Sequence, residues 1–118
     1  MEAITNYLNH SWPTKRQAER VAFNAEVWIN HEGKRLQGTS KDLSGGGICM
    51  VLMDEIPEGT EVDVELLIPE REPLRCRAVV RWTFLGEHGC EYLKLGPAEL
   101  RTIHSLLHAP TNKRRTTR

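Results

Sequence analysis

Two short segments in the first half of the chain carry the residue types best suited to binding an anionic ligand. Arg16 and Arg20 are four residues apart, a spacing that places both guanidinium groups on one side of a helix or turn. Residues 42–47 read Asp-Leu-Ser-Gly-Gly-Gly and join two apolar, strand-like stretches. Glycines let another molecule approach the backbone, while Asp42 and Ser44 supply short polar side chains. Taken separately, the segments have ordinary interpretations: a solvated basic arm, and a Gly-rich turn or β-bulge.

Together the two segments have the chemistry to hold a guanine nucleotide. Guanidinium groups bind phosphate through paired hydrogen bonds, stack on flat bases and match the O6 and N7 acceptors of guanine. The Asp42 carboxylate can accept hydrogen bonds from the N1–H and N2–H₂ edge of guanine, and Ser44 can add another. The nucleotide would then be held by both its phosphate and its base.

Signatures of catalysis are weak. The sequence has no Gly-rich phosphate loop ending in a lysine and no Gly-x-Ser-x-Gly motif. The acids of residues 54–72 alternate outward from an apolar strand or lie in turns, which is typical of a solvated surface. His104 and His108 are four residues apart, and His88 and Cys90 are two apart, but neither pair has a complete ligand signature. We therefore expect no enzyme activity, no catalytic residue, no metal site and no cofactor.

The charge distribution argues against general nucleic-acid binding. The chain has 118 residues, enough for one domain, with 16 basic and 16 acidic side chains. Four of the basic residues lie in the tail 109–118, which has no acid. Residues 1–108 are therefore acidic overall, and nucleic-acid binding would depend on that tail alone.

We also expect a cytoplasmic protein. The N-terminus lacks the basic start and apolar core of a secretory signal, and no apolar run approaches the ~20 residues of a membrane span. Three cysteines, Cys49, Cys76 and Cys90, are an odd number and lie in strand-like sequence. Buried thiols in a reducing compartment are the simplest explanation.

Hydrophobic alternation predicts an all-β domain that ends in one helix. Six strands are predicted, at residues 21–29, 35–43, 48–53, 61–68, 74–84 and 90–95. A helix is predicted to begin at Pro97 and to end at Pro110, with an apolar stripe of Leu100, Ile103, Leu106 and Leu107. Six short strands and one helix favour a small antiparallel barrel or sandwich with the helix packed on it.

Three parts of the chain are expected. Residues 1–14 are predicted to form a flexible arm with a short helix at 4–8, residues 15–108 the folded domain, and residues 109–118 a disordered basic tail.

The order and spacing of these motifs resemble the PilZ domain family. An Arg-x-x-x-Arg motif is followed, after one strand pair, by Asp/Asn-x-Ser-x-x-Gly. Residues 78–82, Ala-Val-Val-Arg-Trp, are similar to a late strand of the family, and residues 89–92, Gly-Cys-Glu-Tyr, to its Gly-x-x-aromatic strand. The resemblance covers about residues 15–108. It implies a six-stranded antiparallel β-barrel that binds the bacterial second messenger cyclic di-GMP.

The same resemblance assigns roles to individual residues. Arg16 and Arg20 would grip the phosphates and guanine faces of the ligand. Asp42, Ser44 and Gly47 would take the guanine edge and the close backbone approach. Members often have a further arginine just before the first motif arginine, where this chain has Lys15. Because lysine lacks the planar fork of arginine, binding of one ligand molecule or of a stacked pair stays open.

The resemblance favours a cyclic di-GMP receptor or adaptor that signals ligand occupancy to a partner protein. We expect the segment from Trp12 to Arg20 to be mobile without ligand and ordered with it. Residues 11–20 hold only Trp12 and Ala18 as apolar side chains, and their basic groups repel one another until an anion arrives. The alternative is a protein-interaction module that keeps the PilZ fold without binding nucleotide.

Overall fold

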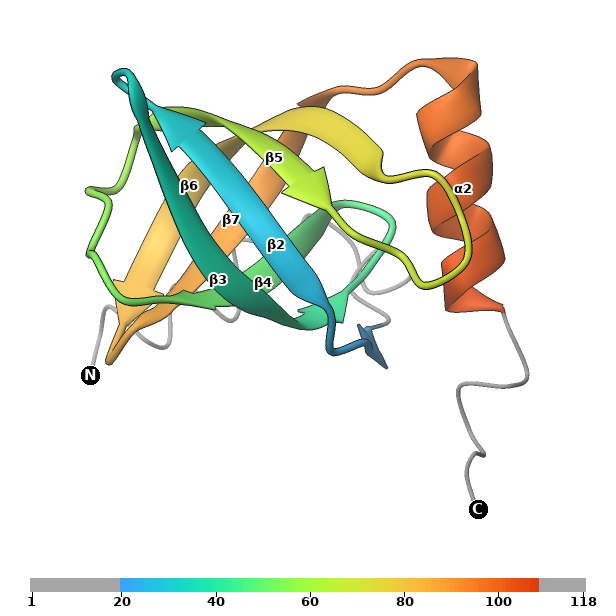
Figure 1. Cartoon of the computed structure of the whole chain (residues 1–118), viewed down its shortest axis with the longest axis horizontal. Coiled ribbons are helices and arrows are strands. Elements are labelled where there is room, and N and C mark those ends of the chain that lie inside the picture. The colour runs from blue at the N-terminus through green and yellow to red at the C-terminus, as the bar shows by residue number, and fades with distance from the viewer. Residues whose placement is uncertain (1–19, 109–118) are drawn as a thin grey trace.

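The computed structural model describes residues 20–108, which form seven strands and one helix (Figure 1). The strands are β1 (Val21–Ala22), β2 (Glu26–His31), β3 (Lys34–Leu43), β4 (Gly47–Leu52), β5 (Glu61–Leu66), β6 (Leu74–Phe84) and β7 (Glu87–Lys94), and the helix is α2 (Pro97–Leu107). The predicted arm (1–14), tail (109–118) and helix end at Pro110 lie outside the described residues.

Six of these strands close into an antiparallel barrel. The order around it is β3-β2-β5-β6-β7-β4, and β4 pairs back onto β3. The short β1 is an additional strand that pairs with the last two residues of β3. The predicted six-stranded antiparallel barrel with a C-terminal helix is therefore confirmed.

The predicted single strand 21–29 is interrupted, and the hydroxyl group of Ser40 explains why. This group accepts a hydrogen bond from the Ala25 N–H (2.9 Å) and donates to the Phe23 carbonyl. The Asn24 side chain in turn donates to the Ser40 carbonyl, at 3.1 Å. Residues 23–25 keep two main-chain hydrogen bonds to β3, from the Phe23 N–H to the Lys41 carbonyl at 3.1 Å and from the Ser40 N–H to the Ala25 carbonyl at 2.8 Å. The side-chain bonds of Ser40 and Asn24 replace the other bonds of the regular ladder between β1 and β2.

β3 has a bulge at the residue after Ser40. The pairing between β3 and β4 shifts between Ser40 and Asp42, which leaves Lys41 as the extra residue. Ser40 is buried, Asp42 pairs with Cys49, and Leu43 is fully buried in the core. Regular alternation would put Asp42 on the same face as Ser40, so the bulge moves Asp42 to the outer face and Leu43 to the inner face.

A second bulge, in β6, also moves a side chain to the outer face of the barrel. Val80 pairs with the buried Cys90, and after a shift at Arg81 the next pair is Trp82 with Gly89. Trp82 therefore lies on the outer face, although its spacing from Val80 would place both on one face in a regular strand.

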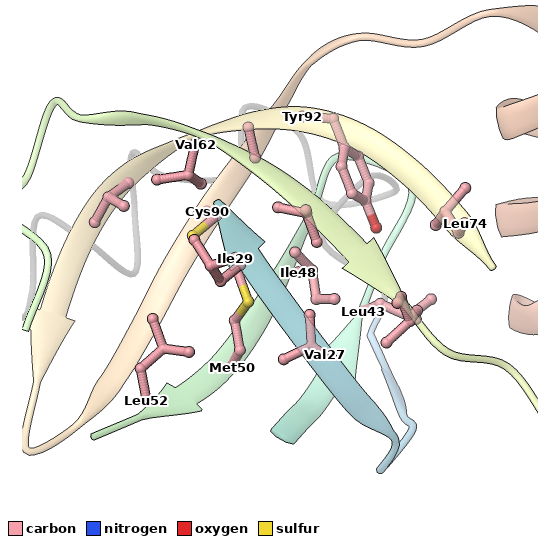
Figure 2. Packing of buried hydrophobic residues seen from close by; sticks show 14 of the residues in the cluster. Val27, Ile29, Leu43, Ile48, Met50, Leu52, Val62, Leu74, Cys90 and Tyr92 are labelled. Carbon is pink, nitrogen blue, oxygen red and sulfur yellow. The ribbon is translucent and has the colours of Figure 1, made fainter. Parts of the chain in front are cut away.

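The barrel interior holds one hydrophobic cluster (Figure 2). It includes Leu43, Ile48 and Tyr92, and α2 contributes Ile103 and Leu106. Leu100, which the helical stripe placed on the buried side, is instead 50% exposed. No helix among the described residues has the length and hydrophobicity that crossing a membrane requires.

His88 has a structural place in this core. It lies in β7, which begins at Glu87, three residues before the start of the predicted strand 90–95. The fully buried ring has Nε2 3.0 Å from the Ile56 N–H and Nδ1 3.0 Å from the Gly86 carbonyl. Burial lowers its pKa below 6.5. A neutral ring that accepts at Nε2 and donates at Nδ1 therefore ties the connection after β4 to the barrel.

We predict that Ser40→Ala destabilises the domain by about 1–3 kcal/mol, because the Ala25 N–H and the Phe23 carbonyl lose their side-chain partner. Urea denaturation measures this change. Ser105→Ala is the control, since Ser105 is exposed and accepts one hydrogen bond from Arg71. Equal midpoints for the two variants would show that the Ser40 hydroxyl does not hold the strand break.

Candidate functional site

The structure joins one residue from each of the two polar segments. Arg20 donates from Nε to Asp42 Oδ1 at 2.7 Å, and its Nη2 lies 2.7 Å from the same oxygen. The two side chains are 23% and 24% exposed. Arg20 directly precedes β1, whose Ala22 pairs with Asp42. Residues 22 positions apart in sequence thus form a half-buried ion pair on the outer face of the barrel.

Ser44 and the glycines after it form a tight turn between β3 and β4. The buried Ser44 Oγ accepts from the N–H groups of Gly46 (3.2 Å) and Gly47 (3.3 Å). The Ser44 N–H donates to the Gly47 carbonyl at 2.8 Å, and the Gly46 carbonyl accepts from Tyr92 at 3.0 Å. Ser44 therefore shapes the loop from inside, while Asp42 faces outward.

The other predicted ligand contacts are Arg16 and Lys15, and both lie outside the described residues. Of the predicted ligand contacts, the structure therefore places Arg20, Asp42, Ser44 and Gly47.

Strand pairing places Asp42 in a row of neighbouring residues that the sequence alone did not bring together. Asp42 pairs with Cys49, Cys49 with Gly89, and Gly89 with Trp82. A Cβ on Gly89 would lie 1.6 Å from Trp82 Nε1, so the indole packs directly over this glycine. We call these four residues the site row. Trp82 and Gly89 stand within the segments that carried the family resemblance, but only the two bulges bring them into line with Asp42.

Charges and burial around the row favour ligand binding over nucleophilic chemistry. Burial raises the pKa of the Cys49 thiol to about 12, and the neighbouring Asp42 carboxylate adds to the shift. The thiol therefore stays protonated at neutral pH. Lys41 lies 2.7 Å from Glu87, and Arg81 lies 2.7 Å from Glu91. The row thus combines a carboxylate that is ion-paired with Arg20, a protonated thiol and an aromatic side chain.

A hollow of about 650 Å³ lies elsewhere, between the start of α2 and strands β5 and β6. Four of its charged lining residues form two pairs: Arg75 lies 3.1 Å from Glu65, and Arg77 lies 3.1 Å from Asp63. Because these groups are mutually satisfied and exposed, we assign the hollow no ligand.

Comparison with known proteins identifies the family. The family model described as PilZ domain matches residues 14–109. The chain belongs to the PilZ domain family. No curated protein matched the chain.

Similar solved structures share the PilZ fold. The inhibitor of motility MotI/DgrA of Bacillus subtilis has a TM-score of 0.68 and 24% identity, over 80% of this chain and 49% of that protein. The PilZ domain of YcgR from Escherichia coli, solved with c-di-GMP, has a TM-score of 0.67 and 14% identity, over 80% and 89% of the two chains. The PilZ domain of CeSA from a cellulose-synthesizing bacterium has a TM-score of 0.62 and 16% identity, over 76% and 95%. This PilZ chain therefore spans about half the length of the Bacillus protein.

We predict that Gly89→Ala displaces the Trp82 indole and costs about 1–3 kcal/mol, because the added methyl group overlaps the ring. The indole N–H resonance of Trp82 should shift, and denaturation should report the loss of stability. Gly45→Ala is the matched control, since nothing lies within 4 Å of a Cβ there. An unchanged Trp82 resonance in Gly89→Ala would contradict the packing of the site row.

Proposed function

We propose that this PilZ domain is a receptor for cyclic di-GMP that passes ligand occupancy to a partner protein and is not an enzyme. The observation that carries the proposal is the ion pair between Arg20 and Asp42, which brings the first motif onto the second. Arginine and aspartate of these two motifs are the groups to which the family resemblance assigns phosphate and guanine contacts.

The geometry of the pair suits guanine recognition. Nε and Nη2 of Arg20 both contact Asp42 Oδ1. Asp42 can therefore keep Arg20 in place while Oδ2 accepts from the N1–H and N2–H₂ edge of a guanine. The held guanidinium group then presents its plane to a base.

The remaining motif residues have supporting roles in this proposal. Ser44 fixes the turn through the N–H groups of Gly46 and Gly47, and Gly47 lets the ligand approach the backbone. Arg16 adds a second guanidinium group toward the phosphates, and Lys15 adds charge. Trp82, in the same row as Asp42, offers an aromatic side chain beside the ligand.

Two findings support the wider assignment. PilZ structures of the same fold include the YcgR domain in complex with c-di-GMP. In this chain, the site row offers a charged pair and an aromatic side chain, and its thiol is protonated. Such a set of groups binds and orients a ligand without attacking it. An output would therefore pass through contact with another protein.

We predict that Arg20→Ala, Asp42→Ala and Arg16→Ala each weaken cyclic di-GMP binding about 30- to 100-fold. Each substitution removes a charge-assisted contact worth on the order of 2–3 kcal/mol. Isothermal titration calorimetry measures the affinities, with GTP and cyclic GMP as competing nucleotides. Arg71→Ala is the matched control, because Arg71 is exposed and contacts Ser105 on α2.

Wild-type affinity in all three variants would contradict the assigned contacts. If the wild-type protein bound no cyclic di-GMP at all, the alternative function, a PilZ-fold interaction module without nucleotide, would take its place.

We further propose that the ligand orders the N-terminal arm. Asp42 and Ser44 lie between paired strands and form the fixed half of the site, whereas Lys15 and Arg16 precede the first strand. Ordering costs about 1–2 kcal/mol per residue, so several ligand contacts must offset it.

The expected result is slower hydrogen exchange of residues 12–20 on addition of cyclic di-GMP, with little change in β5, which carries no residue of the site row. Mass spectrometry of peptic fragments measures both regions in one experiment. Equal protection of residues 12–20 with and without ligand would mean that the arm does not carry the switch.

A further inference from the structure

Four large apolar side chains are exposed at one corner of the barrel, at the end of β4 and in the turn between β6 and β7. We call them the apolar corner: Val51 is 43% exposed, Met53 94%, Phe84 51% and Leu85 86%. The two segments lie together because the Leu52 N–H donates to the Gly86 carbonyl at 3.0 Å (Figure 1). An exposed apolar cluster of this kind marks an interaction surface.

The backbone at Leu85 also indicates that this surface is used. Leu85 has a φ of 50°, in the left-handed region where a side chain such as leucine is sterically disfavoured. Asparagine or glycine would adopt the same turn more easily. The chain therefore carries backbone strain at a position whose side chain is almost fully exposed and contributes little to the core.

Three acidic side chains border the apolar corner. We call them the acidic rim: Asp54, Glu55 and Glu87. Asp54 directly follows Met53, and Glu87 pairs across the sheet with both Val51 and Phe84. Glu55 accepts a hydrogen bond at 3.1 Å from the hydroxyl group of Thr83, the residue before Phe84. The apolar centre is therefore flanked by carboxylates from two sides.

The charge of the rim favours a basic partner. Glu87 has an ion-pair partner in Lys41, at 2.7 Å, whereas neither Asp54 nor Glu55 forms an ion pair within residues 20–108. The rim is thus negative overall. It would repel the same face of a second copy and an anionic membrane, and it would attract lysine or arginine side chains around an apolar contact.

The dimensions of the corner suit a helix. Val51 and Phe84 flank Glu87 on neighbouring strands, so they lie two strand spacings, or about 10 Å, apart. Residues i and i+7 on one face of an α-helix are about 10.5 Å apart along its axis. At Val51, β4 is paired with β3 and with β7, so an added strand finds no free backbone groups there. The occupant must therefore bind through its side chains.

We propose that the apolar corner and the acidic rim together bind an amphipathic, basic helix of a partner protein. Apolar side chains at i, i+4 and i+7 of this helix cover Val51 and Phe84, while the exposed side chains of Met53 and Leu85 pack along its sides. Lysine or arginine residues at the edges of its apolar face meet the acidic rim. This partner is the one that the proposed function leaves open, so its signalling role rests on that function.

The apolar corner borders the site row. Val51 lies two residues after Cys49 on β4, and Phe84 lies two residues after Trp82 on β6. Rows two residues apart along a strand are about 7 Å from each other. A helix bound at the corner would therefore lie beside a ligand held at the site row, on the same outer face.

Titration of the full chain with synthetic peptides, without nucleotide, tests the surface. The probe is a peptide of leucine and lysine, about 18 residues or five turns long, with its leucines on one helical face. One comparison peptide has glutamate in place of every lysine, and another has the same leucines and lysines in scrambled order. Backbone amide chemical shifts locate the contact, and their concentration dependence gives the affinity.

Two variants separate the apolar contact from the charge. The corner variant is Phe84→Thr with Leu85→Asn, which keeps a strand former at 84 and relieves the left-handed position at 85. The rim variant is Asp54→Asn with Glu55→Gln, which removes two charges and keeps an acceptor for Thr83. Leu100→Gln on α2 is the control, because Leu100 is also half exposed, at 50%, and lies on a different element.

We expect the leucine–lysine peptide to shift the amides of residues 51–55 and 84–87, and both comparison peptides to bind at least about 10-fold more weakly. The corner variant should weaken binding about 10-fold or more, and the rim variant about 3- to 10-fold with a smaller dependence on salt. Leu100→Gln should bind as the wild type does. Amide spectra of the free variants show that each one is folded.

Equal binding of the glutamate peptide, shifts confined to other parts of the barrel, or wild-type affinity in the corner variant would each overturn the proposal. Sedimentation that shows a wild-type dimer and a monomeric corner variant would assign the corner to a second copy instead. Flotation with phosphatidylserine vesicles that the corner variant loses would assign it to a membrane. Failure to bind cyclic di-GMP would overturn the proposed function but not this surface, since the peptide titration contains no nucleotide.

Discussion

The buried hydroxyl group of Ser40 is the constraint on which the site depends. It bonds to the Ala25 N–H and the Phe23 carbonyl, and so occupies backbone groups that the sheet would otherwise pair. The strand before it breaks, and β3 takes up one extra residue at Lys41. Because side chains alternate along a strand, this one residue decides which face Asp42 occupies. Asp42 reaches Arg20 on the outer face, and Leu43 fills the core, only as a result of that shift.

A second bulge, at Arg81 in β6, completes the arrangement on the opposite side of β4 and β7. The two bulges act together, since each moves a side chain of the site row, Asp42 or Trp82, to the outer face of its strand. Trp82 then packs over Gly89, where no Cβ fits, and lies in one row with Cys49 and Asp42. β-Bulges near binding sites commonly redirect a side chain in this way.

Two adjacent rows share the outer surface of the barrel. The same three strands, β4, β6 and β7, carry Cys49, Trp82 and Gly89 in one row and Val51, Phe84 and Glu87 in the next. Glu87 connects this surface to β3 through its ion pair with Lys41, the bulged residue beside Asp42.

The sequence by itself determined the fold class and the motif content. Alternation in residues 61–68 and 74–84 and the Pro97 helix start predicted the barrel and its helix, because these patterns are local. Motif order led to the PilZ family, which the comparison over residues 14–109 confirmed. The direction in which Asp42 and Trp82 point, the row they share with Gly89, and the inward turn of Ser44 were decided by the tertiary structure alone. The physical reason is register: a single extra residue in a strand reverses every later side chain, and only pairing with the neighbouring strands shows where that residue lies.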